Sequence, residues 1–247
     1  KRILKRAEKV IGVSEAEVDV YLKAGIDRKR ISVVPNGLDV DDFRELPPLG
    51  SFRNRFQIGD DEKIILFLGR LYRTKRIDTL IDAFAIVRKN LEGLRLVIAG
   101  PDFGMREELQ DQVNRLGIQS EVIFSGPLYG QEKYSAYVDS DLFVSASEHE
   151  IFGLTAFEAI LCGVPVIVGD DCGAGEIIDR EAAGYTVKPG DVNALAQTIN
   201  TAINYPQESV KMVYRGQTFI KNHLDWKYIV TDLEKIYLEV GNQVNAN

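Results

Sequence analysis

The stretch from Ser145 to Val168, SASEHEIFGLTAFEAILCGVPVIV, predicts a strand, a helix and a second strand. The apolar run Asp141–Ser145 that leads into it is typical of a buried strand, and so is the run that begins at Val164. Between them, a helical segment of about ten residues begins at Gly153. A strand, a helix and a second buried strand are the repeating unit of a parallel α/β sheet, so this stretch predicts the α/β class.

Glu158 is the one charged residue in this predicted helix. The other members are apolar, namely Leu154, Ala156, Phe157, Ala159, Ile160 and Leu161. A charge embedded in an apolar surface is costly unless a partner or a ligand satisfies it. The carboxylate could bind a ligand, or it could reach solvent or pair with an arginine elsewhere in the chain. Spacing alone does not decide between these interpretations, because structural ion pairs also occupy such positions.

Glu150 stands just ahead of the same helix, and the first helical amides offer a second kind of contact. The amides of Gly153, Leu154 and Thr155 have no acceptors within the helix, and the helix dipole favours an anion such as phosphate there. Gly153 also leaves room for a ligand to approach closely. Two carboxylates for hydroxyl groups and an amide pocket for phosphate together suit a nucleotide-sugar.

The pattern from Glu150 to Glu158 resembles the E-x7-E motif of retaining GT-B glycosyltransferases, and it is most similar to glycosyltransferase family 4. The resemblance includes Phe152-Gly153-Leu154 inside the motif and Gly163-Val164-Pro165-Val166 behind it. It implies that Glu158 binds the ribose hydroxyls of the nucleotide and that Glu150 contacts the hydroxyls of the transferred sugar. Phe152, Gly153 and Leu154 then belong to the donor site. Ile151 departs from the glycine usual in the family, which would narrow the space beside the donor sugar.

A second cluster, Gly69–Arg76, carries four cations in an otherwise acidic chain. They are Arg70, Arg73, Lys75 and Arg76. Guanidinium groups bind phosphate oxygens bidentately, and a lysine adds a mobile point charge that would stabilise a diphosphate leaving group. A solvated basic loop would look the same in isolation, but this loop follows a predicted strand at the ligand-binding end of the sheet. It resembles the family's G-R-L-x-x-x-K-G, which implies that Arg70 and Lys75 hold the donor diphosphate beside Gly69. Arg76 replaces the family's second glycine.

Three further segments are weaker candidates. The loop Gly126–Gly130 matches the one against which the family packs the nucleobase, so Leu128 and Tyr129 are candidate donor contacts, although such residues more often serve packing. His149 neighbours Glu150 and is a candidate polar contact. The segment Gly173–Glu176 resembles the family's Gly-rich loop near the donor.

Strands and helices alternate from Lys63 onward, with short connections and apolar strands. The predicted strands are Ile64–Leu68, Leu94–Ala99, Val122–Ser125, Leu142–Ser145, Val164–Val168 and Tyr185–Val187. The predicted helices lie near Ile77–Lys89, Met105–Leu116, Gln131–Val138, Gly175–Asp179, 191–204 and 207–223. This order predicts a Rossmann-like, doubly wound parallel sheet, which the resemblance identifies as the C-terminal half of a GT-B fold. Ligands in such sheets bind beyond the carboxyl ends of the strands, where every candidate loop falls.

The chain divides into four segments. Residues 1–40, with the turn cluster Val34–Asp39, resemble the end of the family's N-terminal acceptor-binding domain, and 41–62 form a linker and domain entry. Residues 63–225 form the donor-binding domain, and 226–247 a C-terminal amphipathic helix and tail. The chain begins without methionine and looks like a fragment that lacks most of the first domain. We therefore expect it to bind donor with little or no turnover alone.

Composition excludes several functional classes. The 247 residues are 45% hydrophobic and 27% charged with a net charge of −7, which argues against a general nucleic-acid binder. No apolar run approaches a membrane span and no signal peptide is visible. Cys162 and Cys172 lack metal-ligand spacing, and we interpret them as reduced thiols of a cytoplasmic protein. The basic residues of the segment 1–6 could touch the inner membrane surface, but the sequence favours a solvated helix, because the run is short and its amphipathic pattern is poorly defined.

These observations predict a retaining glycosyltransferase that moves a hexose-type sugar from a UDP-, GDP- or ADP-sugar to a glycan, lipid-linked or small-molecule acceptor. Arg70, Lys75 and Glu150 are its candidate catalytic residues. Neither a metal nor a dinucleotide cofactor is expected, because the chain has no metal-ligand cluster and no G-x-G-x-x-G. Two alternatives stay open, a GT-B nucleotide-sugar epimerase and a non-catalytic nucleotide-binding module.

Overall fold

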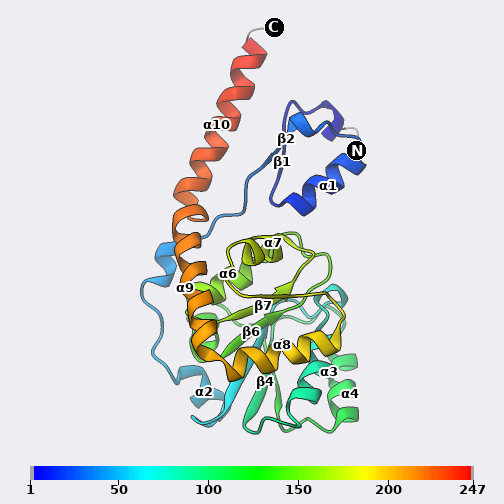
Figure 1. The fold of residues 1–247 in the computed structure, drawn as a ribbon, viewed down its shortest axis with the longest axis vertical. Helices are drawn as coiled ribbons and strands as arrows, with labels where there is room; N and C mark the ends of the chain where they lie inside the picture. The colour runs from blue at the N-terminus through cyan, green and yellow to red at the C-terminus, as the bar shows by residue number, and fades with distance from the viewer. Residues whose placement is uncertain (1–2, 246–247) are drawn as a thin grey trace.

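A computed structural model describes residues 3–245, in which a six-stranded parallel sheet lies between two layers of helices (Figure 1). The strands are β3 (Lys63–Leu68), β4 (Leu94–Ala99), β5 (Val122–Gly126), β6 (Leu142–Ser145), β7 (Val166–Gly169) and β8 (Tyr185–Val187). Their spatial order is β5-β4-β3-β6-β7-β8, and every adjacent pair is parallel. The predicted doubly wound α/β sheet is thereby confirmed. The strand order reverses between β3 and β6, which makes the gap between them the topological switch point.

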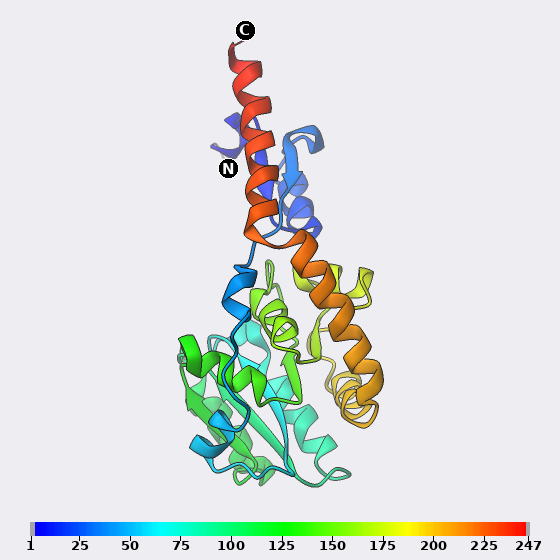
Figure 2. The same cartoon turned by 90° about the vertical axis from the view of Figure 1, so that its left-hand side faces the viewer.

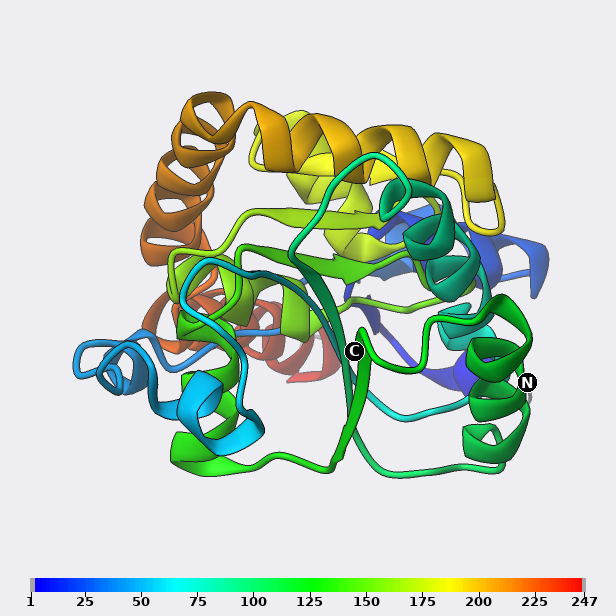
Figure 3. The same cartoon turned by 90° about the horizontal axis from the view of Figure 1, so that it is seen from below.

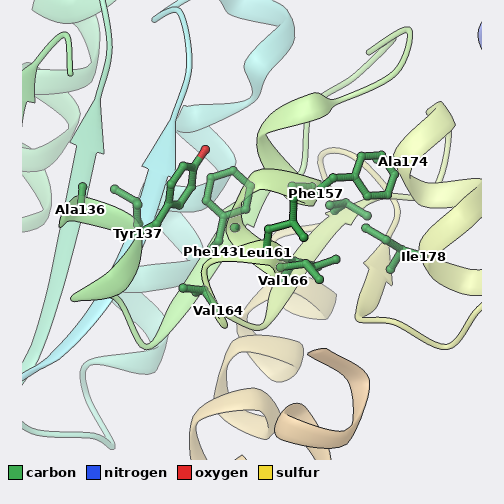
Figure 4. Packing of buried hydrophobic residues seen from close by; sticks show 14 of the residues in the cluster. Ala136, Tyr137, Phe143, Phe157, Leu161, Val164, Val166, Ala174 and Ile178 are labelled. Carbon is green, nitrogen blue, oxygen red and sulfur yellow. The ribbon is translucent and has the colours of Figure 1, made fainter. Parts of the chain in front are cut away.

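Alternating side chains of the strands supply two separate hydrophobic cores, one on each face of the sheet. Ile65 and Phe67 point to the face covered by α3 (Ile77–Val87), α4 (Arg106–Leu116) and α8 (Val192–Asn204). Ile64 and Leu66 point to the opposite face, which is covered by α5 (Gly130–Val138), α6 (Leu154–Leu161), α7 (Gly173–Arg180) and α9 (Pro206–His223). Figure 3 shows helices on both sides of the sheet, and Figure 4 shows Phe143, Phe157 and Val166 packed in the second core.

The strand β7 begins two residues later than its apolar run predicts. The amide of Val164 donates to the carbonyl of Ala159 at 2.9 Å, and Gly163 adopts φ +87°. Val164 therefore belongs to the C-terminal turn of α6, and the pairing of β7 with β6 begins only at Val166.

Residues 3–36 form a small N-terminal unit with its own core (blue in Figures 1 and 2). The helix α1 (Glu15–Lys23) lies between the strands β1 (Val10–Gly12) and β2 (Ile31–Val33) in the chain, and the two strands pair in parallel. Short 3₁₀ helices span Leu4–Arg6 and Arg28–Arg30. Ser14, with Glu17 three residues later, is a capping-box pattern in the sequence, and the structure contains the cap, because the Oγ of Ser14 accepts from the amide of Glu17 at 3.3 Å. Of the basic residues predicted to lie in 1–6, Lys1 and Arg2 fall outside the described residues.

The segment 41–62, predicted as linker and domain entry, contains more structure than expected. A 3₁₀ helix spans Val40–Phe43, and α2 spans Ser51–Phe56. The buried carboxylate of Asp139 accepts from the amides of Gly50, Phe52 and Arg53 at 2.7, 2.8 and 3.0 Å. This cap comes from a residue 86 to 89 positions away, so local sequence patterns could not have predicted it.

The last helix, α10, spans Trp226–Asn245 and is longer than the predicted end near Val240. It rises beside the N-terminal unit in Figure 2, where the Nζ of Lys9 lies 3.4 Å from a carboxylate oxygen of Glu239. Ile229 is buried at its base, whereas Tyr237 and Leu238 are exposed. Across the described residues, no helix combines the length and apolarity needed to cross a membrane.

Candidate functional site

A cleft of about 550 Å³ opens beyond the carboxyl ends of β3 and β6. This is the switch point at which doubly wound sheets bind their ligands, and the volume lies within the range of about 300–1,000 Å³ seen for small-molecule sites. The cleft is lined by Ile11, Val13, Glu17, Asn36, Phe67, Leu68, Gly69, Arg70, Lys75, Ser145, Glu150, Ile151, Phe152, Gly153, Leu154 and Thr155.

Seven of the eleven sequence-predicted site residues lie on this cleft. They are Gly69, Arg70, Lys75, Glu150, Phe152, Gly153 and Leu154. The first three follow β3, and the others follow β6 and begin α6. The two clusters are about 75 residues apart in the chain, and they meet because their strands are neighbours in the sheet.

Lys75 and Glu150 contact each other directly as an ion pair. Their side chains are only 17% and 24% exposed, so the pair is partly withdrawn from water. Around it the two loops are joined twice more. The amide of Glu148 donates to the carbonyl of Thr74 at 2.7 Å, and the Nη1 of Arg76 donates to Glu148 at 3.3 Å. The candidate phosphate-binding lysine and the candidate sugar-binding carboxylate therefore already share one site.

Arg70 lies at the rim of the cleft with an exposed side chain. Its Cζ lies 5.5 Å from the ring centroid of Phe103, which is a cation–π distance. Phe103 belongs to the loop after β4, on the same edge of the sheet. The guanidinium is thus held by a weak contact near the cleft and can turn toward an anion within it.

Gly153 permits the close turn that starts α6. It adopts φ +85°, and a Cβ at this position would lie 3.1 Å from the Cβ of Ala174. Left-handed backbone and close approach both favour glycine here. Leu154 and Thr155, the first two residues of α6, line the cleft, and the amides at the start of a helix have no acceptors within it. An anion in the cleft would suit such a position.

Glu158 lies one turn beyond Leu154 on the same face of α6, outside the lining of the cleft. Its Oε1 accepts from the Nζ of Lys133 at 2.9 Å, and its Oε2 accepts from the hydroxyl of Tyr137 at 3.0 Å. Burial and the neighbouring Glu158 carboxylate raise the pKa of Tyr137 well above its usual value. The partly buried carboxylate therefore has a charged partner, which is a lysine on α5. A carboxylate offers about four acceptor positions, so two donors leave capacity for a ligand hydroxyl.

Leu128, Tyr129 and His149 do not line the cleft. Leu128 is buried in the core and Tyr129 is 71% exposed at the start of α5, so the packing interpretation fits Leu128. His149 adopts φ +56° and lines a second pocket of about 250 Å³. That pocket adjoins the cleft through the shared residues Glu17, Glu150 and Ile151.

The sequence did not predict that residues of the N-terminal unit line one side of the cleft. Ile11, Val13, Glu17 and Asn36 line the cleft opposite the sheet. Glu17 already had a local explanation, because the sequence predicts a capping box with Ser14. In the structure its two oxygens accept from the amide of Val13 at 2.8 Å and from the hydroxyl of Tyr21 at 2.6 Å. No local pattern signals that this carboxylate also faces a distant cleft.

Arg76 adopts a left-handed backbone conformation, which usually favours glycine. It adopts φ +51° between a 3₁₀ turn, Arg73–Lys75, and the start of α3. For a residue with a side chain this conformation costs about 1–2 kcal/mol. Its guanidinium forms ion pairs with Glu148 and Asp78. The loop therefore makes a tight turn with an arginine at this position.

Both cysteines are free, and burial raises the pKa of Cys162 to about 12 and that of Cys172 to about 11. Both values exceed the ordinary value of 9.0. The stabilisation that the two protonated thiols give the folded state is therefore complete below pH 9 and declines as pH rises toward 11–12.

We expect native thiols to react slowly with iodoacetamide at pH 8 and urea midpoints to fall between pH 9 and 11. The loss of stability should be smaller in Cys162→Ala. Rapid alkylation of the native protein at pH 8 would contradict this prediction.

The strand order and the cleft at its switch point define a doubly wound α/β protein with a candidate anion-binding site. Residues 50–219 match the family model described as Glycosyl transferases group 1, and residues 1–42 match that described as Glycosyltransferase Family 4. The chain belongs to the glycosyl transferases group 1 family. The resemblance inferred from the two sequence motifs is confirmed at this level.

Curated relatives agree with the family assignment. The chain is 32% identical over 239 residues to mannosylfructose-phosphate synthase of Agrobacterium fabrum, covering 94% of this chain and 53% of the relative. It is 31% identical over 208 residues to D-inositol 3-phosphate glycosyltransferase of Mycolicibacterium smegmatis, covering 82% and 47%. The chain spans about half the length of the curated relatives that it matches.

Among solved structures, the chain is similar to HepE of Anabaena, which was crystallised in complex with UDP-glucose. The TM-score is 0.85 at 26% identity, covering 98% of this chain and 66% of HepE. The fold is therefore that of GT-B glycosyltransferase structures.

Proposed function

We propose that this chain binds a nucleoside diphosphate sugar and forms the donor-binding part of a retaining glycosyltransferase. One observation carries the proposal. Two cations, a set of free helix amides and a carboxylate surround a single cleft at the switch point of the sheet. A diphosphate joined to a sugar presents the anionic and hydroxyl groups that such a cleft can bind.

The donor would lie across the gap between β3 and β6. Arg70, Lys75 and the amides at the start of α6 would hold the diphosphate, and Glu150 would accept hydrogen bonds from the sugar. Glu158 would bind the ribose, since it follows Leu154 along the same helix face. The diphosphate would displace the carboxylate of Glu150 as the main partner of Lys75, which frees Glu150 for the sugar.

In the proposed reaction the bond between the anomeric carbon and the leaving phosphate oxygen breaks as the acceptor oxygen attacks the same face. The leaving phosphate takes the acceptor's proton, and Arg70 and Lys75 stabilise the charge that develops on it. We assign Glu150 to orientation rather than to covalent catalysis, because attack by the acceptor oxygen on the same face needs no nucleophile from the protein. We expect no protein-bound metal to be needed, because these cations supply the positive charge.

The names of relatives guide the choice of substrates to test. HepE was crystallised with UDP-glucose, and two relatives are named for sugar-phosphate or inositol-phosphate chemistry. We propose a UDP-, GDP- or ADP-linked hexose as donor and a glycan, lipid-linked or small-molecule acceptor. Because relatives are about twice as long, we propose that a larger N-terminal domain completes the acceptor site. This chain alone would then bind donor with little turnover.

A ribose-selective binding test examines the proposal. If Glu158 binds the ribose hydroxyls, the parent should bind UDP about 10- to 150-fold more tightly than 2′-deoxy-UDP, which corresponds to one hydrogen bond to a charged group. Glu158→Ala should weaken UDP binding by a similar factor and leave 2′-deoxy-UDP binding nearly unchanged. Isothermal titration calorimetry would measure both, with GDP and ADP substituted if UDP is not the preferred nucleotide.

Two further variants control for indirect effects. Glu158→Gln retains the size of the side chain and one acceptor oxygen, so it should fall between the parent and Glu158→Ala. Glu132→Gln changes an exposed carboxylate on α5, one residue from Lys133, and should bind UDP like the parent. If Glu158→Ala keeps the parent's preference for ribose, the nucleoside site has been placed wrongly.

A further inference from the structure

Glu176 on α7 caps the helix α1 of the N-terminal unit, 160 residues earlier in the chain. Its Oε1 accepts from the amide of Ala16 at 2.6 Å, and its Oε2 accepts from the amide of Glu15 at 3.1 Å. Ser14 satisfies the third amide of this turn, that of Glu17. Two of the three free amides at the start of α1 are thus satisfied by the sheet domain and not by the helix's own residues.

The two parts of the chain also pack closely at this place. A Cβ on Gly173 would lie 2.9 Å from the Cβ of Ser14, and Ser14 is only 4% exposed. The Gly-rich segment Gly173–Glu176, predicted from resemblance to lie near the donor, is absent from the lining of the main cleft. The segment instead contacts the start of α1 through Glu176 and Gly173.

The position of α1 decides the shape of the cleft. Glu17 on α1 lines the cleft opposite the sheet, together with Val13 just before the helix. The N-terminal unit has its own core, formed by Val10, Val18, Ile26 and Ile31, separate from the two cores of the sheet domain. Among the described residues, Val13 of the N-terminal unit packs against a core of the sheet domain. The two hydrogen bonds that Glu176 accepts therefore act together with this apolar contact in setting the position of α1.

We propose that Glu176 is a positioning residue that fastens α1 over the donor cleft. It touches no ligand and acts by holding the wall that carries Glu17 and Val13. The effect on donor binding rests on the proposed function, whereas the cap itself does not. The coupling between the cap and donor binding is reciprocal. If the cap strengthens donor binding by a given factor, the bound donor strengthens the cap by the same factor.

Amide hydrogen exchange and calorimetry on Glu176→Ala test the proposal. We expect exchange at the amides of Glu15 and Ala16 to accelerate by at least about tenfold, since both lose their acceptor. UDP-glucose should bind about tenfold more weakly, with an unchanged thermal unfolding midpoint for the sheet domain. Glu176→Gln keeps one acceptor oxygen and should recover part of both effects. The control Asp179→Asn changes an exposed carboxylate on the same helix and should alter neither.

Each outcome is decisive. Unchanged exchange at Glu15 and Ala16 in Glu176→Ala would show that the cap does not exist in solution. Faster exchange with parental UDP-glucose affinity would refute the positioning role. If the parent binds none of UDP-, GDP- and ADP-glucose, the proposed function fails and the effect on donor binding fails with it. In that case the exchange rates still decide whether Glu176 holds α1.

Discussion

The double substitution Arg70→Ala, Lys75→Ala is expected to weaken UDP-glucose binding by about 10²- to 10⁴-fold. Each cation would make a charge-assisted hydrogen bond to the diphosphate, worth about 1.5–3 kcal/mol. The range is the sum of the two contributions, and because both cations would contact one diphosphate, the single variants measure how far the two effects add. Calorimetry or competition against a labelled nucleotide would measure the change.

The single variants should differ in a way that the Lys75–Glu150 pair predicts. Lys75→Ala removes a cation and also leaves the carboxylate of Glu150 without its partner beside a dianionic ligand. We therefore expect Lys75→Ala to cost more affinity than Arg70→Ala. Adding Glu150→Gln to Lys75→Ala should restore part of the loss, because the repulsive charge is then gone.

Arg73→Ala is the matched control for this series. Arg73 lies in the same loop with an exposed side chain, but it does not line the cleft. Its removal should change affinity by no more than about twofold, through weak and salt-screened attraction. An effect as large as that of Arg70→Ala would mean that the general charge of the loop, and not specific contacts, attracts the ligand.

Gly100→Ala is expected to destabilise the protein by about 4 kcal/mol or more. Gly100 adopts φ +145°, a region that residues with a side chain rarely occupy, and a Cβ there would lie 1.7 Å from the carbonyl oxygen of Gly69. Neither backbone can move aside easily. The amide of Gly69 donates to Ala99 and that of Gly100 donates to Gly126, both at 2.9 Å. Because Gly69 precedes Arg70, donor binding should fail as well.

Gly104→Ala in the same loop separates backbone strain from the clash. Gly104 also has positive φ, +89°, but a Cβ there would have nothing within 4 Å. Its cost should be limited to the conformational strain of about 1–2 kcal/mol. Urea unfolding followed by circular dichroism would compare the two variants. Equal losses of stability would show that contact with Gly69 does not matter.

The sheet was predictable because its strands are encoded locally. Leu94–Ala99 and Leu142–Ser145 occur with the predicted bounds, since buried parallel strands are continuous apolar runs that end at turn residues. The start of α1 was likewise predictable from Ser14 and Glu17, which cap it from within four residues. The same local signals predicted that the cation loop and Glu150 follow strands that end at one edge of the sheet, with Glu158 in the helix that follows.

Contacts between distant residues could not be predicted in the same way. Three such contacts join residues 25 to 161 positions apart, namely the ion pair of Lys133 with Glu158, the cap of α2 by Asp139 and the cap of α1 by Glu176. Each depends on which strands are neighbours and on how the connecting helices pack, and these are properties of the whole chain.

The sequence by itself determined the α/β class, the elements of the sheet and the loops that carry the candidate site, because short-range periodicity and capping encode them. The tertiary structure alone decided which loops meet at the switch point, that Lys75 pairs with Glu150, and that α1 closes the opposite wall of the cleft. These features arise from strand order and long-range packing, which no local stretch of the chain specifies.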